Sequence, residues 1–412
     1  MQQDLSDPTG SGELDAVPAD TYIEHGERAA ASLARPAVTR LLLSDFRGYA
    51  ALRLEVDDRP VVLTGPNGAG KTNLLEAISF LAPGRGLRRA RLKEIDRRLS
   101  PAGEIAGAWA LSARLETAKG AVQIGTGRDA ASDSGERRLL LIDGSKPKSQ
   151  GVLAEYAHFV WLTPQMDRLF LESGSGRRRF LDRLVLGFDP SHAQRLGAYE
   201  RSLAERAKLL RDGPADPVWL AALEERLAAD GIAIAAARRD MVARLDEACA
   251  TSAGPFPQAR LALAGEVEDW LRAMPALAAE EELRRRLTDG RRGDAESGST
   301  GIGPHRSDLV VHHVGNGMPA ALCSTGEQKA LLIAILLAHA RLRAAASGAA
   351  PLLLLDEVAA HLDAGRRAAL FAELTGMGAQ AWLTGTEPAL FAGLSRHAQF
   401  FSIADAAVRP LS

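Results

Sequence analysis

The segment from Gly65 to Thr72 reads GPNGAGKT and has the spacing of a phosphate-binding loop. Its glycines allow backbone amides to wrap phosphate oxygens, and a helix that follows would direct the positive end of its dipole at them. Lys71 is expected to reach the β- and γ-phosphates of a nucleoside triphosphate and Thr72 to hold Mg²⁺. The predicted contacts are Gly65, Pro66, Asn67, Gly68, Ala69, Gly70, Lys71 and Thr72. A chance glycine-rich turn is the alternative, which a strand before the loop and a helix after it would disfavour.

Two adjacent acids follow an apolar run much later in the chain. Leu352 to Leu355 predict a buried strand, which places Asp356 and Glu357 at the C-terminal edge of a sheet. Beside a phosphate loop, Asp356 would bind Mg²⁺ and Glu357 would polarise the attacking water as a catalytic residue. Without such a loop, the pattern would be a core strand that ends in a surface acid.

A third motif, Cys323 to Lys329, reads CSTGEQK and precedes the helical pattern of Ala330 to Arg343. Ser324 is expected to cap this helix, so that open amides near Ser324, Gly326 and Glu327 can bind an anion. An ordinary capped helix is the alternative interpretation.

The three motifs together resemble those of ABC ATPases, whose signature lies just before the acidic strand and closes over the γ-phosphate of the other subunit. The resemblance implies a homodimer with two ATP molecules sandwiched between the copies, because this chain has one phosphate loop and one signature. It also implies that Asp363 lies in the D-loop and contacts nucleotide. Gln165 resembles the Q-loop glutamine and would reach Mg²⁺ and the attacking water with Lys71 and Glu357, although a solvated loop glutamine is a near-equal alternative.

Most ABC ATPases have a histidine after the strand that corresponds here to Ala381 to Leu383. This chain has Thr384, Gly385 and Thr386 instead. A threonine hydroxyl is therefore the expected substitute for the histidine that senses the γ-phosphate, with the choice between Thr384 and Thr386 left open.

Further segments resemble the RecF family, a branch of the ABC ATPases related to the SMC and Rad50 proteins. They are Asp45 to Tyr49, Thr163-Pro164, Gly176 to Asp182, Gly303 to Leu309 and Ser324 to Ala330. The resemblance implies ATP-dependent dimerisation on double-stranded and gapped DNA, with slow ATP hydrolysis resetting the dimer. It also implies a RecR-type partner that helps to load RecA in recombinational repair and replication.

These motifs require an α/β fold, an ABC-type ATPase head of the P-loop class with mixed sheets and helices, plus a helical second lobe. The expected organisation is a disordered tail at 1–37, a first ATPase part at 38–190, a helical lobe at 191–290 and a second ATPase part at 291–412. The alternation from Val38 to Val56 predicts two antiparallel strands at the sheet edge, turning at Arg47-Gly48.

Short segments around the phosphate loop are expected to form its frame. They are a strand at Pro60 to Leu63, a helix at Thr72 to Leu81 and further strands between Ile105 and Leu141. In the helical lobe, four prolines predict two or three helices of ordinary length, followed by a loose segment from Gly290 to Gly303. The prolines are Pro214, Pro217, Pro255 and Pro257.

Composition narrows the class of protein. The 412 residues carry 50 Lys and Arg against 52 Asp and Glu, so any nucleic-acid site must be a local basic patch. The two cysteines, Cys249 and Cys323, lie far apart without metal-ligand spacing, which disfavours a disulfide framework and indicates a reducing, cytoplasmic compartment. The apolar runs are shorter than the roughly 20 residues of a bilayer-spanning helix, so no membrane partner is expected.

A basic run follows the predicted phosphate-loop helix, and Arg85, Arg88, Arg89 and Arg91 are its candidate DNA contacts. A solvated charged face is the alternative. Arg177 to Arg179 are either DNA contacts or structural ion pairs. His305 and Arg306 could touch the signature or DNA, and a buried, hydrogen-bonded His305 is the equal alternative.

Rival functions make different predictions. A long-range bridging protein of the SMC or Rad50 type needs hundreds of heptad residues, whereas the insertion here spans roughly a hundred residues broken by prolines. A transporter ATPase would be expected to keep its switch histidine, and a nuclease-linked ATPase would need a carboxylate cluster outside the ATP site.

Overall fold

The computed structural model describes residues 35–99, 104–132, 137–213, 216–252 and 254–411. Most of the tail predicted at 1–37 lies outside the described residues, and the first strand begins at Ala37. Within the described part of the chain, strands form one six-stranded, one five-stranded and one two-stranded sheet.

The six-stranded sheet contains the strand that leads into the phosphate loop. Its strands, in spatial order, are β13 (Ala407–Pro410), β12 (Gln399–Ala404), β3 (Val61–Thr64), β11 (Ala381–Gly385), β10 (Leu352–Leu355) and β7 (Phe159–Leu162). All neighbours are parallel except β12 and β13. Strands β3, β7, β10 and β11 are buried along their whole length, as expected for parallel strands covered on both faces.

The five-stranded sheet is antiparallel throughout. Its strands, in spatial order, are β2 (Tyr49–Glu55), β1 (Ala37–Phe46), β4 (Ala110–Thr117), β5 (Gly120–Arg128) and β6 (Arg138–Ile142). The predicted hairpin is present, but the prediction that both of its strands lie at the sheet edge is wrong for β1, which pairs with β2 on one side and β4 on the other. Alternation cannot show how many partners a strand has.

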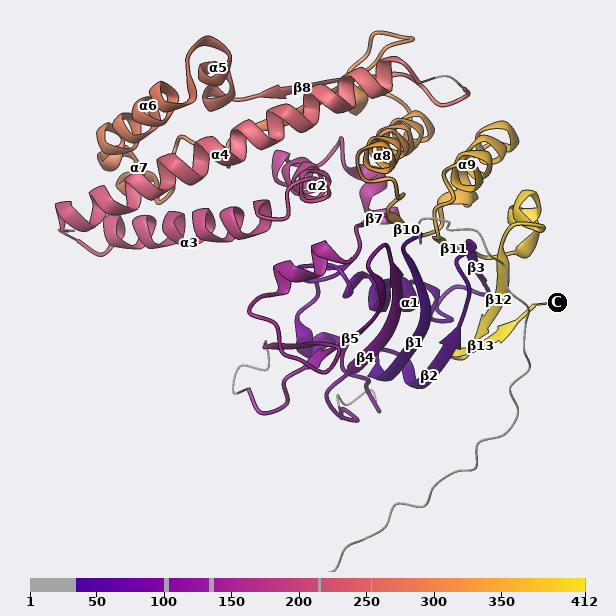
Figure 1. Cartoon of the computed structure of the whole chain (residues 1–412). Coiled ribbons are helices and arrows are strands. Elements are labelled where there is room, and N and C mark those ends of the chain that lie inside the picture. Colours follow the sequence, from indigo (N-terminus) through magenta and orange to yellow (C-terminus); the bar gives the residue numbers. More distant parts are fainter. Residues whose placement is uncertain (1–34, 100–103, 133–136, 214–215, 253, 412) are drawn as a thin grey trace, which may run out of the picture. The chain divides into compact units, whose positions relative to one another are not determined.

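Helix α1 (Lys71–Ser79) begins directly after the phosphate loop and packs against β1 and β11 (Figure 1). Phe46 of β1, Phe80 after the helix and Trp109 form an aromatic cluster with ring centroids 4.9 to 6.2 Å apart. This shared core fixes the phosphate loop between the two sheets.

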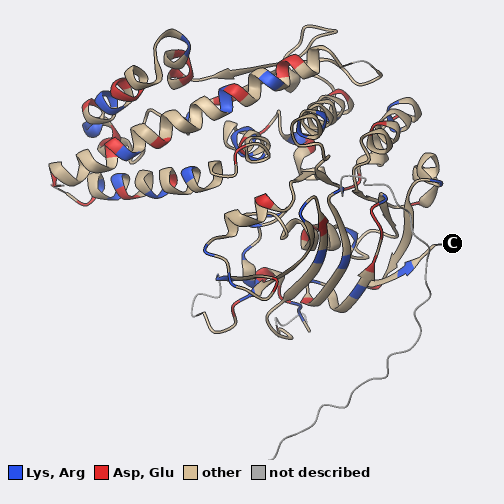
Figure 2. Cartoon of the chain, in the orientation of Figure 1, with Lys and Arg blue, Asp and Glu red and all other residues tan. Residues whose placement is uncertain are grey.

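Between β7 and β9 (Asp308–His313) the described chain forms helices α2 (Gly174–Leu186), α3 (His192–Arg211), α4 (Pro217–Ala250), α5 (Glu266–Ala273), α6 (Ala276–Asp289) and α7 (Arg291–Ser297). Figure 1 shows α3 alongside α4, which also contacts α2, α5 and α6. Acidic and basic residues both occur along α4 and α6 (Figure 2), as expected for helices with one solvated face.

Three features of this region differ from the sequence-based expectation. Helix α4 is 34 residues long because Pro217 occupies its first turn, where proline is tolerated, after the cap Asp216. Strand β8 (Ala259–Ala264) lies within the predicted helical lobe and pairs with β9 (Asp308–His313). The segment from Gly290 to Gly303, which was expected to be loose, contains α7. Pro214, one of the four prolines predicted to break the helices, lies outside the described residues.

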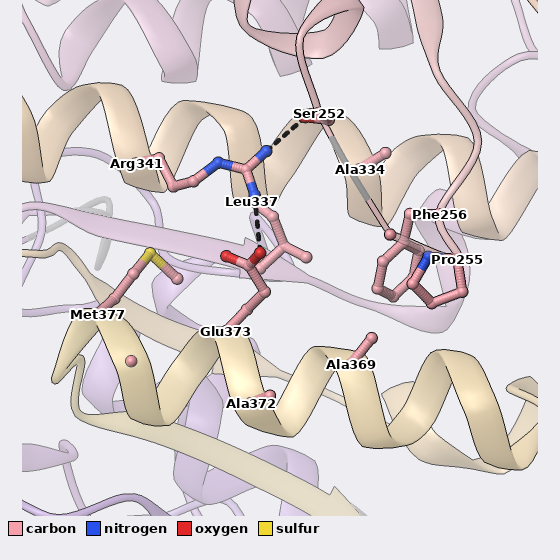
Figure 3. A pocket seen from close by; sticks show the side chains of 12 residues that line it. Ser252, Pro255, Phe256, Ala334, Leu337, Arg341, Ala369, Ala372, Glu373 and Met377 are labelled. Atoms are coloured by element: carbon pink, nitrogen blue, oxygen red, sulfur yellow. Dashed lines mark hydrogen bonds and ion pairs between the residues drawn. The ribbon is translucent and has the colours of Figure 1, made fainter.

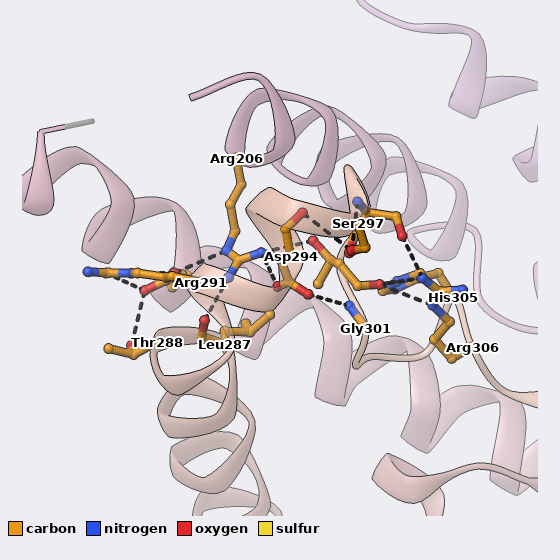
Figure 4. Close-up of polar contacts among 12 residues, drawn as sticks. Arg206, Leu287, Thr288, Arg291, Asp294, Ser297, Gly301, His305 and Arg306 are labelled. Carbon is orange, nitrogen blue, oxygen red and sulfur yellow. Dashed lines mark hydrogen bonds and ion pairs between the residues drawn. The ribbon is translucent and has the colours of Figure 1, made fainter. Parts of the chain in front are cut away.

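A buried ion network explains why α7 is ordered. Arg206 of α3 is fully buried and bonds Glu224 of α4, Asp294 of α7 and the carbonyl oxygen of Leu287 (Figure 4). Arg291 binds the same Glu224 through two bonds of 2.9 and 2.6 Å. Tertiary partners therefore fix this short segment where local sequence gave no helical pattern.

Two helices flank the acidic strand β10. They are α8 (Thr325–Ser347) and α9 (Ala364–Met377). A cavity of about 410 Å³ is lined by these two helices, by Ser252 and by residues 254–256, and Arg341 in its wall bonds Ser252 and Glu373 (Figure 3). By length and apolar composition α8 is the one described helix that meets the criteria of a membrane span, but 61% of its most apolar window is buried inside the protein, as in a core helix.

Short 3-10 helices complete the connections. They are η1 (Leu92–Ile95), η2 (Gln150–Glu155), η3 (Pro164–Arg168), η4 (Ala320–Leu322), η5 (Val358–His361) and η6 (Pro388–Leu394).

Candidate nucleotide site

The phosphate loop leaves β3 and enters α1 with backbone angles that favour glycine. Gly65 has φ of 150°, and a Cβ atom there would lie 2.1 Å from the carbonyl oxygen of Ile403. Gly70 has φ of 109°, and its carbonyl accepts a hydrogen bond from the Tyr49 hydroxyl at 3.1 Å. Because a side chain would clash or be strained at both positions, glycine is required for the loop to close around phosphates.

Lys71 is the first residue of α1, and its side chain folds back into the phosphate loop. Its side-chain ammonium donates to the carbonyl oxygens of Gly65 at 2.7 Å and Pro66 at 2.8 Å. Burial lowers the pKa of Lys71, and the negative charges of Glu357 and Asp356 oppose this shift. The ammonium thus bonds only to neutral oxygens in this structure and has charge available for an anion.

Asp356 meets two threonine hydroxyls at the C-terminal edge of the sheet. Thr72 donates to both of its carboxylate oxygens at 3.0 Å, and Thr384 donates to Oδ1 at 2.7 Å. Burial raises the pKa of Asp356, Glu357 raises it further, and the two hydrogen bonds lower it. Carboxylate and hydroxyl oxygens converging beside a phosphate loop are a donor set that suits Mg²⁺.

Strand β11 lies between β3, which leads into the phosphate loop, and β10, which leads into the acidic pair Asp356 and Glu357. Thr384 is a residue of β11. The Thr384 hydroxyl also accepts a hydrogen bond from the backbone N–H of Glu357 at 2.8 Å, and the residue is fully buried. Thr384 therefore supports the acidic pair from within the sheet, while Thr386 is exposed beyond the end of β11. Its place after β11 had marked Thr384, together with Thr386, as a candidate γ-phosphate sensor, but its bonds to Asp356 and to the Glu357 backbone had no signal in the sequence.

Glu357 and Gln165 follow adjacent parallel strands. Leu355 of β10 is in register with Leu162 of β7, so both residues lie beyond the same sheet edge. Glu357 has φ of 51°, an uncommon conformation for a residue with a side chain, and one that often occurs at functional sites. Gln165 is exposed at the start of η3.

The predicted signature begins α8 with a capping box. The Ser324 hydroxyl accepts a hydrogen bond from the Glu327 backbone N–H, and the Glu327 carboxylate accepts one from the Ser324 backbone N–H at 2.8 Å. Ser324 and Gly326 are exposed, and a Cβ atom built on Gly326 would meet open space. Within the described residues, neither residue makes a hydrogen bond to the phosphate loop of its own chain.

Lys329 is a residue of this region that sequence reasoning missed. It is 3% exposed, and its ammonium lies 3.4 Å from the Asp167 carboxylate, the Glu357 carbonyl oxygen and His361 Nδ1. It thereby ties the signature helix to the segments after β7 and β10. Its place within CSTGEQK was the only available signal.

Asp363 caps the other flanking helix. Its carboxylate accepts a hydrogen bond from the backbone N–H of Arg366 at 2.8 Å, and this bond starts α9. The residue is exposed, two positions beyond His361.

Comparisons with known proteins show the family to which this chain belongs. The family model described as "RecF/RecN/SMC N terminal domain" matches residues 37–402. The DNA replication and repair protein RecF of Rhizobium etli (strain CIAT 652) is 49% identical over 375 residues, covering 90% of this chain and 98% of that protein. The chain belongs to the RecF family. RecF of Mesorhizobium japonicum is likewise 49% identical over 381 residues, covering 92% of this chain and 98% of that protein.

Solved structures agree with the fold. A structure of the recombination mediator protein RecF-ATPrS in the RecFOR pathway has a TM-score of 0.78 at 23% identity, covering 92% of this chain and 99% of that chain. The Smc head domain of Pyrococcus furiosus has a TM-score of 0.51 at 16% identity, covering 91% and 96%. The predictions of the RecF family and of an ABC-type ATPase head are confirmed, and the chain is an ATPase of this DNA replication and repair family.

The segments that suggested the RecF family bind one another. Arg177 forms two bonds to Asp308, of 2.8 and 2.6 Å, and Arg178 donates to the carbonyl oxygen of Ser307 at 2.6 Å. Asp182 accepts two bonds from Arg238, which also donates to the carbonyl oxygen of Pro304. These contacts favour the structural interpretation of Arg177 and Arg178.

His305 is also engaged internally. Its Nδ1 atom lies 2.7 Å from the Tyr199 hydroxyl and its Nε2 atom 2.9 Å from the carbonyl oxygen of Thr300, while burial lowers its pKa. Arg306 donates to the same Thr300 oxygen (Figure 4). The hydrogen-bonded alternative therefore describes His305, which is partly buried, whereas Arg306 is exposed.

The candidate DNA-contacting arginines fall into two groups. Arg88 donates to Asn73 at 2.9 Å and pairs with the buried Glu76 at 3.1 Å. Arg85, Arg89 and Arg91 are exposed. Only the exposed group has side chains free to reach an extended ligand without breaking an internal ion pair.

Proposed function

We propose that two copies of this chain close around two ATP molecules and clamp DNA during recombinational repair and replication. Nucleotide binding drives the clamping, and slow hydrolysis resets the dimer. The RecF family membership supports the role in repair, and the relatives' published names assign them to DNA replication and repair.

The observation that carries this proposal is the division of the nucleotide site between two parts of the chain. Lys71 is enclosed by the phosphate loop, whereas Ser324 and Gly326 are exposed at the start of α8 and make no hydrogen bond to that loop in the described structure. The capping box occupies the N–H groups of Ser324 and Glu327, so the exposed turn at Gly326 is the part of this helix start that could receive a phosphate. The second copy would supply it.

The proposed roles follow from the side-chain chemistry. ATP would lie in the phosphate loop with Lys71 on its β- and γ-phosphates, and Mg²⁺ would be held by Thr72 and, through water, by Asp356. Glu357 would polarise the attacking water, and Gln165 would contact that water and Mg²⁺. Ser324, Gly326, Glu327 and Asp363 would contact nucleotide from the partner copy.

DNA binding rests on a local basic surface, because the whole chain has a formal net charge of -2. The exposed candidates for contacts to DNA phosphates are Arg85, Arg89 and Arg91. Arg88 is paired with Glu76 and would not contact DNA directly. Gapped DNA or single-strand/double-strand junctions are the proposed targets. A RecR-type partner and loading of RecA in the cytoplasm complete the proposal.

Mass measurement with and without ATP tests the dimer. Lys71→Ala should remain monomeric because the phosphates lose their enclosed cation, whereas Glu357→Gln should accumulate as a dimer because hydrolysis no longer resets it. Glu296→Gln is the matched control, since Glu296 is an exposed acid paired with Arg292 on α7. A monomeric Glu357→Gln protein in the presence of ATP and DNA would contradict the sandwich.

A gel-shift series tests the DNA part. Wild-type protein should retain gapped duplex better than blunt duplex when ATP is present, and binding should weaken as salt rises because phosphate contacts release counterions. Binding that is absent, or that ignores salt, would contradict a DNA clamp. Copurification with a RecR-type protein tests the proposed partner separately.

A further inference from the structure

A cavity of about 670 Å³ lies between the segment that follows α1 and helices α2 and α3. Strand β7 and η3 form its remaining wall, so Gln165 also lines it. Cavities of this size can hold a ligand group of several heavy atoms. Its most distinctive lining is a set of guanidinium groups, which we call the cleft arginines: Arg85, Arg89, Arg179 and Arg183.

The cleft arginines come from two elements and lack counterions. Arg85 and Arg89 follow α1, whereas Arg179 and Arg183 lie one turn apart on α2. Within the described structure, none of the four forms an ion pair with a carboxylate. Their neighbours Arg88 and Arg177 do, with Glu76 and Asp308. Gathering unpaired cations is unfavourable unless another anion offsets their charge.

Arg183 is the most enclosed member. Its guanidinium carbon lies 4.4 Å from the centre of the Trp161 ring and 5.8 Å from that of Phe180. Its Nε atom is buried without a hydrogen-bond partner, and within the described residues its guanidinium donates only a weak hydrogen bond, to the Met166 sulfur at 3.5 Å. Burial and the charge of Arg89 lower the pKa of Arg183 to about 9. The aromatic faces stabilise this cation only in part.

Arg89 adds an independent sign of a constrained site. Its φ is 55°, a conformation that is uncommon for a residue with a side chain. Burial lowers its pKa, Arg179 and Arg85 lower it further, and only Glu200 opposes them. The backbone therefore holds this side chain among other positive charges.

Acidic residues in the cavity wall do not neutralise this cluster. Asp182 is bound by Arg238 and His192. Glu172 and Glu200 also line the cavity, but neither carboxylate forms an ion pair with a cleft arginine in the described part of the chain. The cleft therefore keeps an excess of positive charge.

We propose that the cleft arginines bind phosphate groups of the DNA backbone. This inference rests on the proposed DNA-binding function and changes its set of contacts, because it adds Arg179 and Arg183 and leaves out Arg88 and Arg91. Three of the four side chains are exposed, which suits an extended chain of phosphates. Trp161 is only 8% exposed and is covered by Arg183, so the cleft reads backbone phosphates and does not stack bases.

The position of the cleft links DNA to the ATP site. Gln165 lies in its wall and follows β7, the neighbour of the strand that carries Asp356 and Glu357. DNA in the cleft would therefore press on the loop proposed to contact Mg²⁺ and the attacking water.

The test compares Arg89→Gln/Arg179→Gln with wild type and with Arg53→Gln/Arg292→Gln, using ATP and one gapped duplex. The control removes the same charge from exposed residues paired with Glu55 and Glu296. Each lost phosphate contact should lower the slope of log affinity against log salt by about 1, so the cleft variant should lose about 2 and the control little. Arg89→Lys/Arg179→Lys should restore most of the slope because the charge returns.

A cleft variant with an unchanged slope would overturn the proposal while leaving DNA binding by the protein intact. If wild type itself bound no DNA, the proposed function and this inference would both fail. Thermal melting of Lys71→Ala with tripolyphosphate then separates the sources. Stabilisation that disappears in Lys71→Ala/Arg89→Gln/Arg179→Gln would mean that the cleft takes free phosphates instead of DNA.

Discussion

Buried charged side chains have different partners in the nucleotide site and in the helical region formed by α3, α4 and α7. In the nucleotide site, Lys71 bonds to neutral carbonyl oxygens and Asp356 to neutral hydroxyls. In the helical region, Arg206 meets Glu224 and Asp294 directly. The pKa directions follow this division, since that of Asp356 is raised by burial whereas that of Glu224 is lowered by its hydrogen bonds to Arg291 and Arg206 despite burial.

The difference teaches how to separate supporting charges from binding charges. A charged side chain that forms an ion pair within the chain holds two elements together. A charged side chain that bonds only to neutral groups can still attract an oppositely charged ligand. By this criterion the cleft arginines resemble Lys71, and Arg177 resembles Arg206.

The largest expected effect comes from breaking the helical network. Arg206→Met should lower the free energy of unfolding by about 3–5 kcal/mol, because Glu224 and Asp294 each lose a buried cation. Urea denaturation measures the loss, and ATP affinity measured below the transition should stay within about twofold. Loss of ATP affinity with unchanged stability would reverse the comparison.

A pair of acids should respond oppositely to neutralisation. The pKa of Asp182 is lowered through His192 and Arg238 despite burial, so its contribution to stability is present above its unfolded pKa and is lost as pH falls through the folded value. Asp356 has a raised pKa, so its ionised form costs stability above that folded value, and this cost disappears as pH falls toward 3.8.

Asp182→Asn should therefore be destabilised by about 2–4 kcal/mol at pH 7, whereas Asp356→Asn should be equally or more stable than wild type. The difference in urea midpoint between Asp356→Asn and wild type should close as pH falls toward 3.8, whereas that between Asp182→Asn and wild type should shrink only below 3.8. An Asp356→Asn protein that is strongly destabilised at pH 7 would show that this acid holds the fold together.

A smaller effect is expected behind the acidic pair. Thr384→Val keeps the side-chain shape but removes the bonds to Asp356 and to the Glu357 backbone. The Mg²⁺ concentration that half-activates ATP hydrolysis should rise about 10-fold or more, as for loss of a group that supports a metal ligand. Thr375→Val is the control because that hydroxyl bonds only to its own helix. An unchanged Mg²⁺ requirement would remove Thr384 from the site.

The smallest effect should come from an exposed pair. Arg285→Gln removes ion pairs with Glu282 and Asp289 on α6, where all three side chains are solvated. The urea midpoint should stay at the wild-type value, because exposed ion pairs contribute little to stability. A shifted midpoint would mean that exposed ion pairs stabilise α6, which would contradict the expected difference between them and the buried ion pairs of Arg206.

Local patterns allowed much of the nucleotide site to be predicted. GPNGAGKT with a strand before it and a helix after it needs only neighbouring residues, and the run of four leucines defined β10 at its exact bounds. Lys329, the support from Thr384 and the α7 helix escaped prediction because their partners lie far away in the chain.

The sequence alone determined which groups are available for phosphate and metal chemistry, because glycine freedom, helix capping and strand burial are local properties. Tertiary structure decided which charges are neutralised: Arg177 meets Asp308 across 131 positions, while Arg89 lies near the charges of Arg179 and Arg85 and forms no ion pair within the described residues. Charge pairing depends on distances in space, and a run of arginines in a sequence does not contain them.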